Sequence, residues 1–537
     1  MAIQLTDFSS FPRKYKWLIL AITVHFTMTM FLGLSRHWGY LSSINDLGMF
    51  DQALWNSLNQ KTLINTILTN QPINWLGFHF NPVLFLFVPF YAIIPSAIWF
   101  VIAQALALSI TAWPIFLLTK RVGLDEQTGV IWCLVYFLNP FLFNAAVSDF
   151  HPISLAVPFT VIGMLSIEKN DFRLLFISCV FILLCQEHLG LMVAGFGVLW
   201  WIRTKRLPTA VVLIIIGLFH FCLVLGVVMP ALSPTNEHFM FGKGAGQLNR
   251  YNWLGDSLTE IIKTIIFHPV LTVSHVFSMM GVKIYLCLLF LFFVGFPFAA
   301  PEFLLPALAD LMANILSANP MPRSPLSYHS VNIVPIFTIA AIFGSLRISN
   351  RFQKITVKEL AGLVLVTCGI SWYCLLPLPL PGAINYWNPI HVFNKPDPNI
   401  PKIQLLIGQD ASVSAQANIG AHFSQRPEIY CYPNKADSAD VIILRLHSPT
   451  NNLRRTQNLE AKDLKYVMFM LDNHLQMNRN IYLNSIASLL KDKNYSILLW
   501  KDPWLVMRRN NKNNDNQMKK EVILKLETLR LEWKNNE

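Results

Sequence analysis

Long apolar runs recur through the first 384 residues and are separated by short polar stretches. A helix needs about 20 apolar residues to cross the ~30 Å hydrocarbon core of a membrane. Runs of this kind occupy residues 17–35, 98–119, 127–147, 153–167, 174–202, 209–230, 284–300, 302–316, 332–346 and 360–379. The pattern therefore predicts a polytopic α-helical membrane protein.

Two apolar runs do not fit a simple crossing. Residues 80–95 form a short, proline-rich run, which favours a helix lying in the outer interface of the membrane. Residues 174–202 are long for a single crossing, and polar residues 185–188 interrupt them, so we expect two short crossings there. With these two assignments the sequence predicts about 11 transmembrane helices.

Basic residues indicate the orientation, because cytoplasmic loops carry an excess of Lys and Arg. Such residues cluster at the ends of several runs: Arg13, Lys14 and Lys16; Lys120 and Arg121; Lys169 and Arg173; Arg203, Lys205 and Arg206; Arg347, Arg351, Lys354 and Lys358. All of these clusters are cytoplasmic if residues 80–95 do not cross and residues 174–202 cross twice. We therefore expect a cytoplasmic N-terminus and an extracytoplasmic C-terminal domain.

Charge density divides the chain into parts. Residues 1–384 contain 36 charged side chains, about 9%, whereas residues 385–537 contain another 36, about 24%, which is the ordinary value for soluble protein. A purely soluble enzyme, a fibrous protein and a disordered chain are excluded. We expect a transmembrane domain over 1–384 with a long first outer loop at 36–97, a linker at 385–400, an α/β domain at 401–509 and a charged tail at 510–537.

The net charge of +12 comes without a dense basic patch, so membrane lipid is the expected partner and nucleic acid is not.

The C-terminal part contains short apolar runs, most of them with strand composition, at 403–408, 428–433, 440–446, 466–471, 495–500 and 504–509. A helical pattern fits 480–491. A second, amphipathic helix over 521–533 could bind the membrane surface or a partner. These elements predict a small extracytoplasmic α/β domain.

Candidate functional residues fall on the predicted outer face. The first outer loop carries Asp46, Asp51 and His79, and the following segments carry Asp149 and His151, then Glu187 and His188, and finally Arg323, Tyr328 and His329. Unsatisfied polar groups are costly in hydrocarbon, so such residues tend to face a cavity or one another. We therefore predict that they line one site.

Each of these residues also has a structural interpretation. Asp46 could cap a helix in its loop, and Asp51 is more readily explained as structural. Asp149 and His151 flank a turn before a proline, and His79 and His329 could be interfacial histidines. Glu187 and His188 are the hardest to explain structurally, because a simple break in an apolar run needs only Gly or Pro.

The residue types limit the chemistry. No nucleophile elbow, phosphate-binding loop or zinc-protease motif is present. A carboxylate can deprotonate a hydroxyl group, and histidine or arginine can bind a phosphate. Asp149, His151 and Glu187 could hold a divalent cation, although no local spacing requires one and the site could equally work without a metal.

Several segments carry a family resemblance. NDLGMFDQALWN (45–56), FHFNP (78–82), SDFHPISLAVP (148–158), QEHLGL (186–191), RYNWLGDS (250–257), APEFLLPAL (300–308), RSPLSYH (323–329) and DASVSAQANIGAHFSQRPEIYCYP (410–433) resemble a prokaryotic membrane-protein family known as domain of unknown function 2079. The resemblance covers roughly residues 40–450. It implies the cytoplasmic membrane of a bacterium or archaeon.

That family in turn resembles the C-superfamily (GT-C) membrane glycosyltransferases of the protein O-mannosyltransferase type. The resemblance implies a GT-C-like fold and transfer of a sugar from a polyprenyl-phosphate donor to an acceptor lipid, glycan or protein. It implies that Asp46 is the general base or orders the acceptor and that Glu187 belongs to the catalytic site. Residues lining the donor would be His151, His188, Arg250, Arg323, Tyr328 and His329, with Asp51, His79 and Asp149 beside them. One departure is that Asp46 is followed by Leu47 instead of a second acidic residue.

Two functions of other classes are compatible with the same residues. A transporter or flippase of a lipid-linked substrate would use them as a proton relay, although no inverted repeat is visible in the spans. A noncatalytic envelope scaffold or sensor would use the C-terminal domain to bind a ligand.

Overall fold

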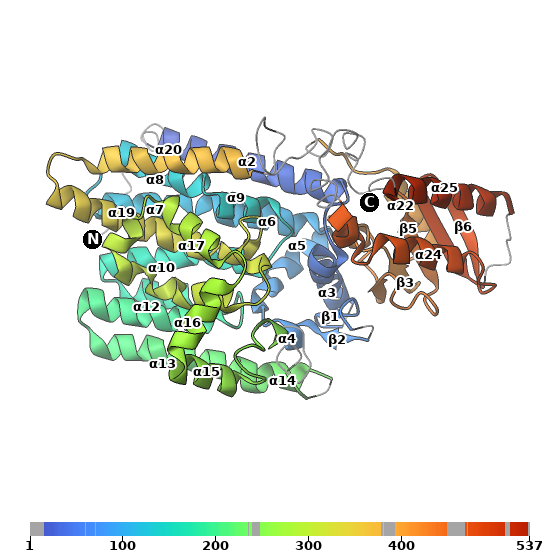
Figure 1. Ribbon diagram of the computed structural model, residues 1–537, viewed down its shortest axis with the longest axis horizontal. Helices are drawn as coiled ribbons and strands as arrows, with labels where there is room; N and C mark the ends of the chain where they lie inside the picture. The colour runs from blue at the N-terminus through green and yellow to red at the C-terminus, as the bar shows by residue number, and fades with distance from the viewer. Residues whose placement is uncertain are drawn as a thin grey trace. The chain divides into compact units, whose positions relative to one another are not determined.

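The computed structural model describes residues 15–59, 61–69, 71–234, 236–238, 248–376, 380, 393–447, 468–469, 471–510 and 516–534 (Figure 1). The chain forms two compact units, each assembled from separate segments. The helical unit comprises Met1–Gly33, Leu76–Leu84 and Val101–Trp387. The sheet unit comprises Leu34–Trp75, Phe85–Phe100 and Asn388–Glu537.

The helical unit consists of apolar helices. They are α7 (Ala112–Arg121), α8 (Glu126–Phe137), α9 (Pro140–Val147), α10 (Val157–Lys169), α11 (Phe172–Leu183), α12 (Leu189–Thr204), α13 (Leu207–Leu223), α14 (Met229–Leu232), α15 (Leu258–Phe267), α16 (Pro269–Ser278), α17 (Val282–Leu291), α18 (Leu308–Leu316), α19 (Ile333–Arg351) and α20 (Val357–Leu375). Helices α2 (Lys16–Trp38), α4 (Trp75–Phe78) and α6 (Ile98–Ile110) contribute residues to both units.

Among the residues described, six helices are long and apolar enough to cross a membrane, or eight if two bent pairs each count as one span. The chain is therefore a mostly helical protein with several candidate membrane spans. The predicted break within 174–202 is confirmed, because α11 ends at Leu183 and α12 begins at Leu189. Both helices are shorter than the candidate spans, so two crossings there stay a prediction. The run 80–95 forms only a 3₁₀ turn at Pro82–Phe87 and the short α5 (Val88–Ile93).

Two predicted spans are interrupted by backbone that cannot continue a helix. The run 284–300 is helical only as far as Leu291, and the run 302–316 is α-helical only from Leu308 onwards. Gly295 has a left-handed φ of 71°, and prolines at 297, 301 and 306 lack the N–H that a helix needs. The segments between are 3₁₀ turns, Phe296–Ala299 and Pro301–Ala307.

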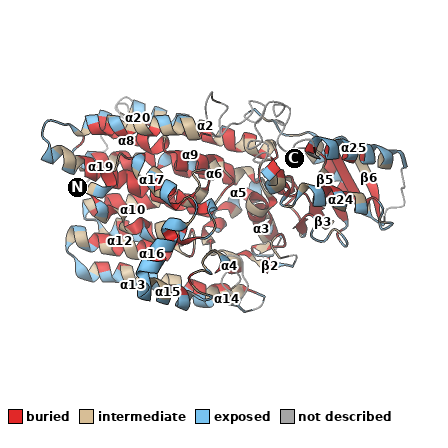
Figure 2. Ribbon diagram, viewed as in Figure 1, coloured by how far each residue is buried: buried red, intermediate tan, exposed pale blue. Residues whose placement is uncertain are grey.

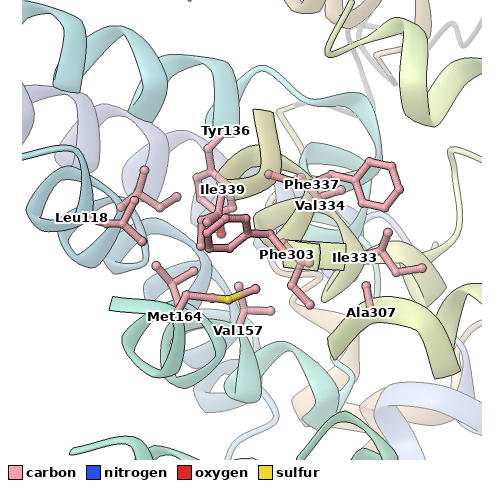
Figure 3. Packing of buried hydrophobic residues seen from close by; sticks show 14 of the residues in the cluster. Leu118, Tyr136, Val157, Met164, Phe303, Ala307, Ile333, Val334, Phe337 and Ile339 are labelled. Atoms are coloured by element: carbon pink, nitrogen blue, oxygen red, sulfur yellow. The ribbon is translucent and has the colours of Figure 1, made fainter. Parts of the chain in front are cut away.

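The core of the helical unit is a continuous apolar cluster. Side chains from α7, α8, α10 and α19 meet there, among them Leu118, Tyr136, Met164 and Phe337, all nearly or fully buried (Figure 3). Helices α12 and α13 approach closely through glycines. A Cβ on Gly217 would lie 2.3 Å from the carbonyl oxygen of Gly190, so the contact requires residues without side chains.

One end of the helical unit gathers charged side chains. Arg203 at the end of α12 forms two hydrogen bonds of 2.8 Å with the carboxylate of Glu168 at the end of α10, and Arg121 donates to the Glu168 carbonyl at 3.0 Å. Arg347, near the end of α19, pairs with Glu302. Two of the basic clusters expected on one side of the membrane thus contribute ion pairs at these helix ends, and a third contributes a hydrogen bond to a backbone carbonyl. The opposite ends of α10, α12 and α19 carry the histidines described below.

The sheet unit has a five-stranded mixed sheet in the order β4-β3-β5-β7-β6. Its strands are β3 (Val413–Ala415), β4 (Ile429–Cys431), β5 (Val441–Arg445), β6 (Tyr495–Lys501) and β7 (Trp504–Arg509). Strand β3 is parallel to both β4 and β5, whereas β7 is antiparallel to β5 and β6. The remaining elements are α3 (Met49–Leu58), a small hairpin of β1 (Ile64–Asn65) and β2 (Ile73–Asn74), α22 (Asn399–Ile407), α24 (Arg479–Leu489) and α25 (Asn516–Lys534).

Four of the strands coincide with predicted apolar runs, and the differences have identifiable causes. Run 403–408 belongs to helix α22, because Ile403 and Ile407, four residues apart, are the buried positions while Leu405 is 85% exposed. Strand β3 has only three residues and was not predicted. Half of run 466–471 and the linker residues 385–392 lie outside the described part of the chain.

The tail forms helix α25, and one apolar side of this helix packs within the sheet unit, while Ile523, Leu524 and Leu531 are exposed. Val522, Leu526, Leu529 and Trp533 are buried and pack in one core with strands β5, β6 and β7 and helix α24. The amphipathic helix is thus present, and binding of its exposed apolar residues to the membrane surface or a partner stays a prediction. The i, i+4 spacing marks an amphipathic helix correctly, but it cannot say which surface the apolar side covers.

Candidate functional site

The break between α11 and α12 presents a buried carboxylate to segment 78–82. Both oxygens of Glu187 accept hydrogen bonds at 3.0 Å, one from Nδ1 of His79 and one from the backbone N–H of Phe80. The side chain of Asn81 adds a hydrogen bond to the Cys185 carbonyl. Burial by itself would raise the pKa of Glu187, but the charge and hydrogen bond of His79 and the charge of His188 lower that pKa to about 2.

The next residue forms a second imidazole–carboxylate pair. Nε2 of His188 lies 3.3 Å from Oδ1 of Asp310, a buried residue on α18. Burial opposes protonation of His188, but the charge and hydrogen bond of Asp310, with the charge of Glu187, raise the pKa of His188 above its ordinary value. Asp310 was not among the predicted site residues, although an acidic residue inside an apolar run is a recognisable signal.

Two further histidines lie on either side of Tyr328. The ring of His151 stacks on that of Tyr328, and the Tyr328 and His329 rings stack with centroids 4.2 Å apart. Nδ1 of His151 donates to the backbone carbonyl of Asp149 at 2.8 Å, and Nδ1 of His329 bonds the hydroxyl of Ser327. Burial lowers the pKa of His151 to about 4 and that of His329 to about 3.

These groups form one electrostatic cluster, which we call the imidazole cluster: His79, His151, His188 and His329, with Glu187 and Asp310. The charge of His79 acts on His151, and the charges of His151, Arg250 and His188 act on His329. The two carboxylates are buried while the four imidazoles are only half-buried. The accessible part of the cluster is therefore imidazole.

The cluster lies at helix N-termini. His188 directly precedes α12, His151 precedes the 3₁₀ turn Pro152–Ala156 that leads into α10, and His329 lies just before α19. Backbone N–H groups at a helix N-terminus carry partial positive charge and favour an anion. Helix ends and half-buried imidazoles together suit an anionic ligand.

The two predicted arginines differ. Arg323 is buried, and its guanidinium donates to three backbone carbonyls, those of Met280, Asn314 and Ser317. Its donors thus hold the loop in place, as they would in a structural role. Arg250 is half-buried and acts electrostatically on His329, with its own carbonyl accepting from Ala318 N–H at 2.7 Å.

The three candidate metal ligands do not form a metal site. Within the part of the chain that the structure describes, no group of three or more His, Cys, Asp or Glu residues is arranged to hold a metal ion. Both Glu187 oxygens are occupied by donors, and the His151 ring is held by the Asp149 carbonyl and by Tyr328. The expectation that Asp149, His151 and Glu187 ligate one cation is therefore corrected.

The remaining predicted residues belong to the sheet unit. Asp51 is buried and accepts three hydrogen bonds, from the hydroxyls of Tyr91 (2.9 Å) and Ser424 (2.6 Å) and from Gln425 Nε2 (3.1 Å). Burial raises the pKa of Asp51, an effect that these hydrogen bonds oppose. This arrangement fits the structural interpretation of Asp51.

Asp46 lies half-buried in a helical turn, Ile44–Gly48, whose N-cap is Ser43. Asp46 is therefore not the capping residue of its loop. The turn packs against residues 417–421, since the Ile44 N–H donates to the Ala417 carbonyl at 2.8 Å and a Cβ on Gly420 would lie 2.4 Å from Ile44 Cδ1.

Comparison with models of protein families shows to which family the chain belongs. The model of a family described as "Predicted membrane protein (DUF2079)" matches residues 36–498. The chain belongs to this family. No curated protein matches the chain.

The DUF2079 segments pack on one another within each unit. In the helical unit, FHFNP contacts QEHLGL through the His79–Glu187 pair, and SDFHP contacts SPLSYH through the His151–Tyr328 stack. In the sheet unit, the segment carrying Asp51 contacts the 410–433 segment through Ser424. These stretches, all within the matched residues 36–498, thus build polar contacts inside each unit.

Proposed function

We propose that this DUF2079 member is a membrane glycosyltransferase-like protein that transfers a sugar from a polyprenyl-phosphate donor to an envelope acceptor on the outer face of the membrane. The observation that carries the proposal is the imidazole cluster, in which half-buried imidazoles surround helix N-termini. The imidazolium of His188, imidazole N–H groups and backbone N–H groups are suitable partners for a phosphate ester. The resemblance to GT-C enzymes supplies the reaction class.

In the proposed reaction the bond between the sugar anomeric carbon and the donor phosphate oxygen breaks, and a bond from that carbon to the acceptor oxygen forms. The phosphate leaves with the electron pair of the broken bond, and His188 and Arg250 stabilise its charge. The acceptor proton goes to a carboxylate, the role that the resemblance gives to Asp46. Glu187 and Asp310 act as positioning residues, because each orients an imidazole, and Asp310 also favours the protonated form of His188.

Complementation of a deletion strain tests this proposal. Asp46→Asn, Glu187→Gln and His151→Ala should each abolish restoration of the envelope glycan while the variant still accumulates in the membrane. Ser438→Ala, at an exposed position of the sheet unit, is the control and should restore the wild-type glycan. Full complementation by all three site variants would refute the catalytic assignment.

A transporter or flippase is the second candidate, and the linked pairs favour it. His79, Glu187, His188 and Asp310 form two adjacent imidazole–carboxylate pairs, the kind of arrangement that relays protons. Purified protein in vesicles separates the two functions. A transferase releases free polyprenyl phosphate from a labelled lipid-linked sugar, whereas a flippase moves the intact labelled lipid between leaflets without cleaving it.

A further inference from the structure

Helices α15 and α16 form a sharply bent apolar pair in the helical unit. Their axes differ by 100° across a break at His268 and Pro269. Each helix has 10 residues and is about 15 Å long, so the bent pair reaches only about 20 Å end to end. A crossing needs ~30 Å. The pair is therefore too short and too bent to act as one span.

Both ends of the pair are fixed to the same segment, residues 313–323. Before α15, Tyr251 donates to the Ala313 carbonyl at 3.1 Å and Trp253 donates to the Leu316 carbonyl at 2.9 Å. After α16, the Met280 carbonyl accepts from Arg323 at 3.0 Å. Since one short segment holds both ends, the start of α15 and the end of α16 lie close to the same place, residues 313–323, and the chain between them turns back on itself.

The outward side of the pair is exposed, as the pale blue colour of α16 indicates (Figure 2), and its large side chains are mostly apolar. Phe267, Val270 and Leu271 around the bend are 72%, 79% and 69% exposed. The exposed side also carries Ile262, Ile266, Val273, Phe277 and Met280. The inward side packs through Ile261 and Val276 on a small core with Leu254, Val282 and Leu316. The fold thus buries one side of each helix and leaves the other without protein cover.

Charge indicates what covers this side. Residues 264–282 include no Asp, Glu, Lys or Arg, and the two charged side chains of the pair, Glu260 and Lys263, lie on α15 ahead of this stretch, away from the bend. The exposed polar side chains nearer the bend include His268 and His275. A contiguous apolar surface of this size is unfavourable in water, and a protein partner would normally be accompanied by a charged or polar rim. The acyl chains of lipids can cover an apolar surface without forming ion pairs or hydrogen bonds, so lipid is the cover that this side of the pair favours.

We propose that α15–α16 is a re-entrant hairpin whose exposed apolar side is embedded in the acyl chains of the bilayer, with both of its ends on one side of the membrane. The hairpin does not add a crossing. This inference does not depend on the proposed function, because it uses only the bend, the shared anchor and the exposed apolar side chains.

Photo-crosslinking tests the lipid contact. The full chain with a benzophenone amino acid at position 270 is reconstituted in vesicles of phosphatidylethanolamine and phosphatidylglycerol and illuminated. We expect a lipid adduct on the protein at several times the yield obtained with the same group at exposed Ile481 of the sheet unit. Ile215 on α13, exposed on a candidate span, is the positive control. A covalent dimer of the chain, or no lipid adduct at position 270 while position 215 gives one, would overturn the proposal.

Labelling of the two ends tests the path of the chain. Asp256→Cys and Lys283→Cys are made separately in a background where Cys222, Cys287 and Cys374 are alanine, since those thiols are at least partly exposed. A membrane-impermeant maleimide added to one side should label both variants or neither. Labelling of the two positions from opposite sides would show that the pair crosses the membrane.

Discussion

Glu187 and His188 are neighbours in the chain, yet each forms an ion pair with a different partner. Glu187 pairs with His79 from segment 78–82, whereas His188 pairs with Asp310 on α18. A charge buried without a partner is costly, so each pair depends on both members being present. Two consecutive polar residues thereby connect three separate segments at one helix break.

Replacement of Glu187 by Gln should destabilise the helical unit by about 3 kcal/mol at neutral pH, because His79 and the Phe80 N–H lose a charged acceptor. The folded pKa of about 2 lies below the ordinary 4.5, so the contribution of Glu187 is complete above pH 4.5 and is lost as the pH falls toward 2. Thermal unfolding in detergent from pH 7 to 3 should show the wild-type and variant curves converging. Lys525→Met, which removes an ion pair with the exposed Asp502, is the control and should change stability by less than about 1 kcal/mol.

Ser424→Ala should weaken the sheet unit, because it leaves one oxygen of the buried Asp51 without its 2.6 Å donor. An unsatisfied buried acceptor costs about 1–3 kcal/mol. Hydrogen exchange of the strand amides measures the loss. Ser438→Ala, at an exposed position, should leave exchange unchanged, and equal effects of the two variants would contradict this role of Ser424.

At the scale of elements, the sequence is informative where a pattern is local. The polar interruption at 185–188 predicts the end of α11 and the start of α12, and the alternation of apolar runs predicts β4 to β7. The breaks at 291–308 were missed because average hydropathy does not register Gly295 or the three prolines. Asp310 could be noticed in its apolar run, but its partner His188 lies 122 positions away in the chain, and no local pattern pairs them.

Close packing of α12 on α13 gives a prediction about two glycines. Gly217→Ala should destabilise the helical unit, because its Cβ would lie 2.3 Å from the Gly190 carbonyl oxygen and the backbone cannot move away without separating the helices. Gly226→Ala is the matched control, since no atom lies within 4 Å of its Cβ position. Midpoints of thermal unfolding in detergent compare the two variants. A Gly217→Ala midpoint equal to that of Gly226→Ala would show that the contact is not needed.

At the scale of the whole molecule, both units are built from distant segments. The sheet unit combines residues 34–75 and 85–100 with residues 388–537. Thr66 links these parts, because its hydroxyl donates to the Ile429 carbonyl at 2.7 Å and accepts from the Ile429 N–H at 3.0 Å. Composition alone assigns the first outer loop, residues 36–97, to the membrane part of the chain. The composition of a segment does not show which distant segment it pairs with.

A chain that ends at residue 387 should therefore contain an unpaired loop. Residues 40–75 would lose their hydrogen bonds to the 410–433 segment and become sensitive to proteases in native membranes. Limited proteolysis with mass spectrometry should find cleavage in this loop of the truncated chain and not in the full chain. Persistent protection in the truncated chain would mean that the loop folds on its own.

The pairing of Thr66 with Ile429 also has a consequence for synthesis on the ribosome. The two residues are 363 positions apart. At 5–20 residues per second, Ile429 is made roughly 20–70 s after Thr66. During that interval, Oδ2 of the Asp51 carboxylate lacks its donor Ser424, and the Thr66 hydroxyl lacks both of its hydrogen bonds to Ile429. Most of the chain is therefore synthesised before the loop can form its contacts with the 410–433 segment, and a chain that lacks that segment keeps these polar groups of the loop unpaired.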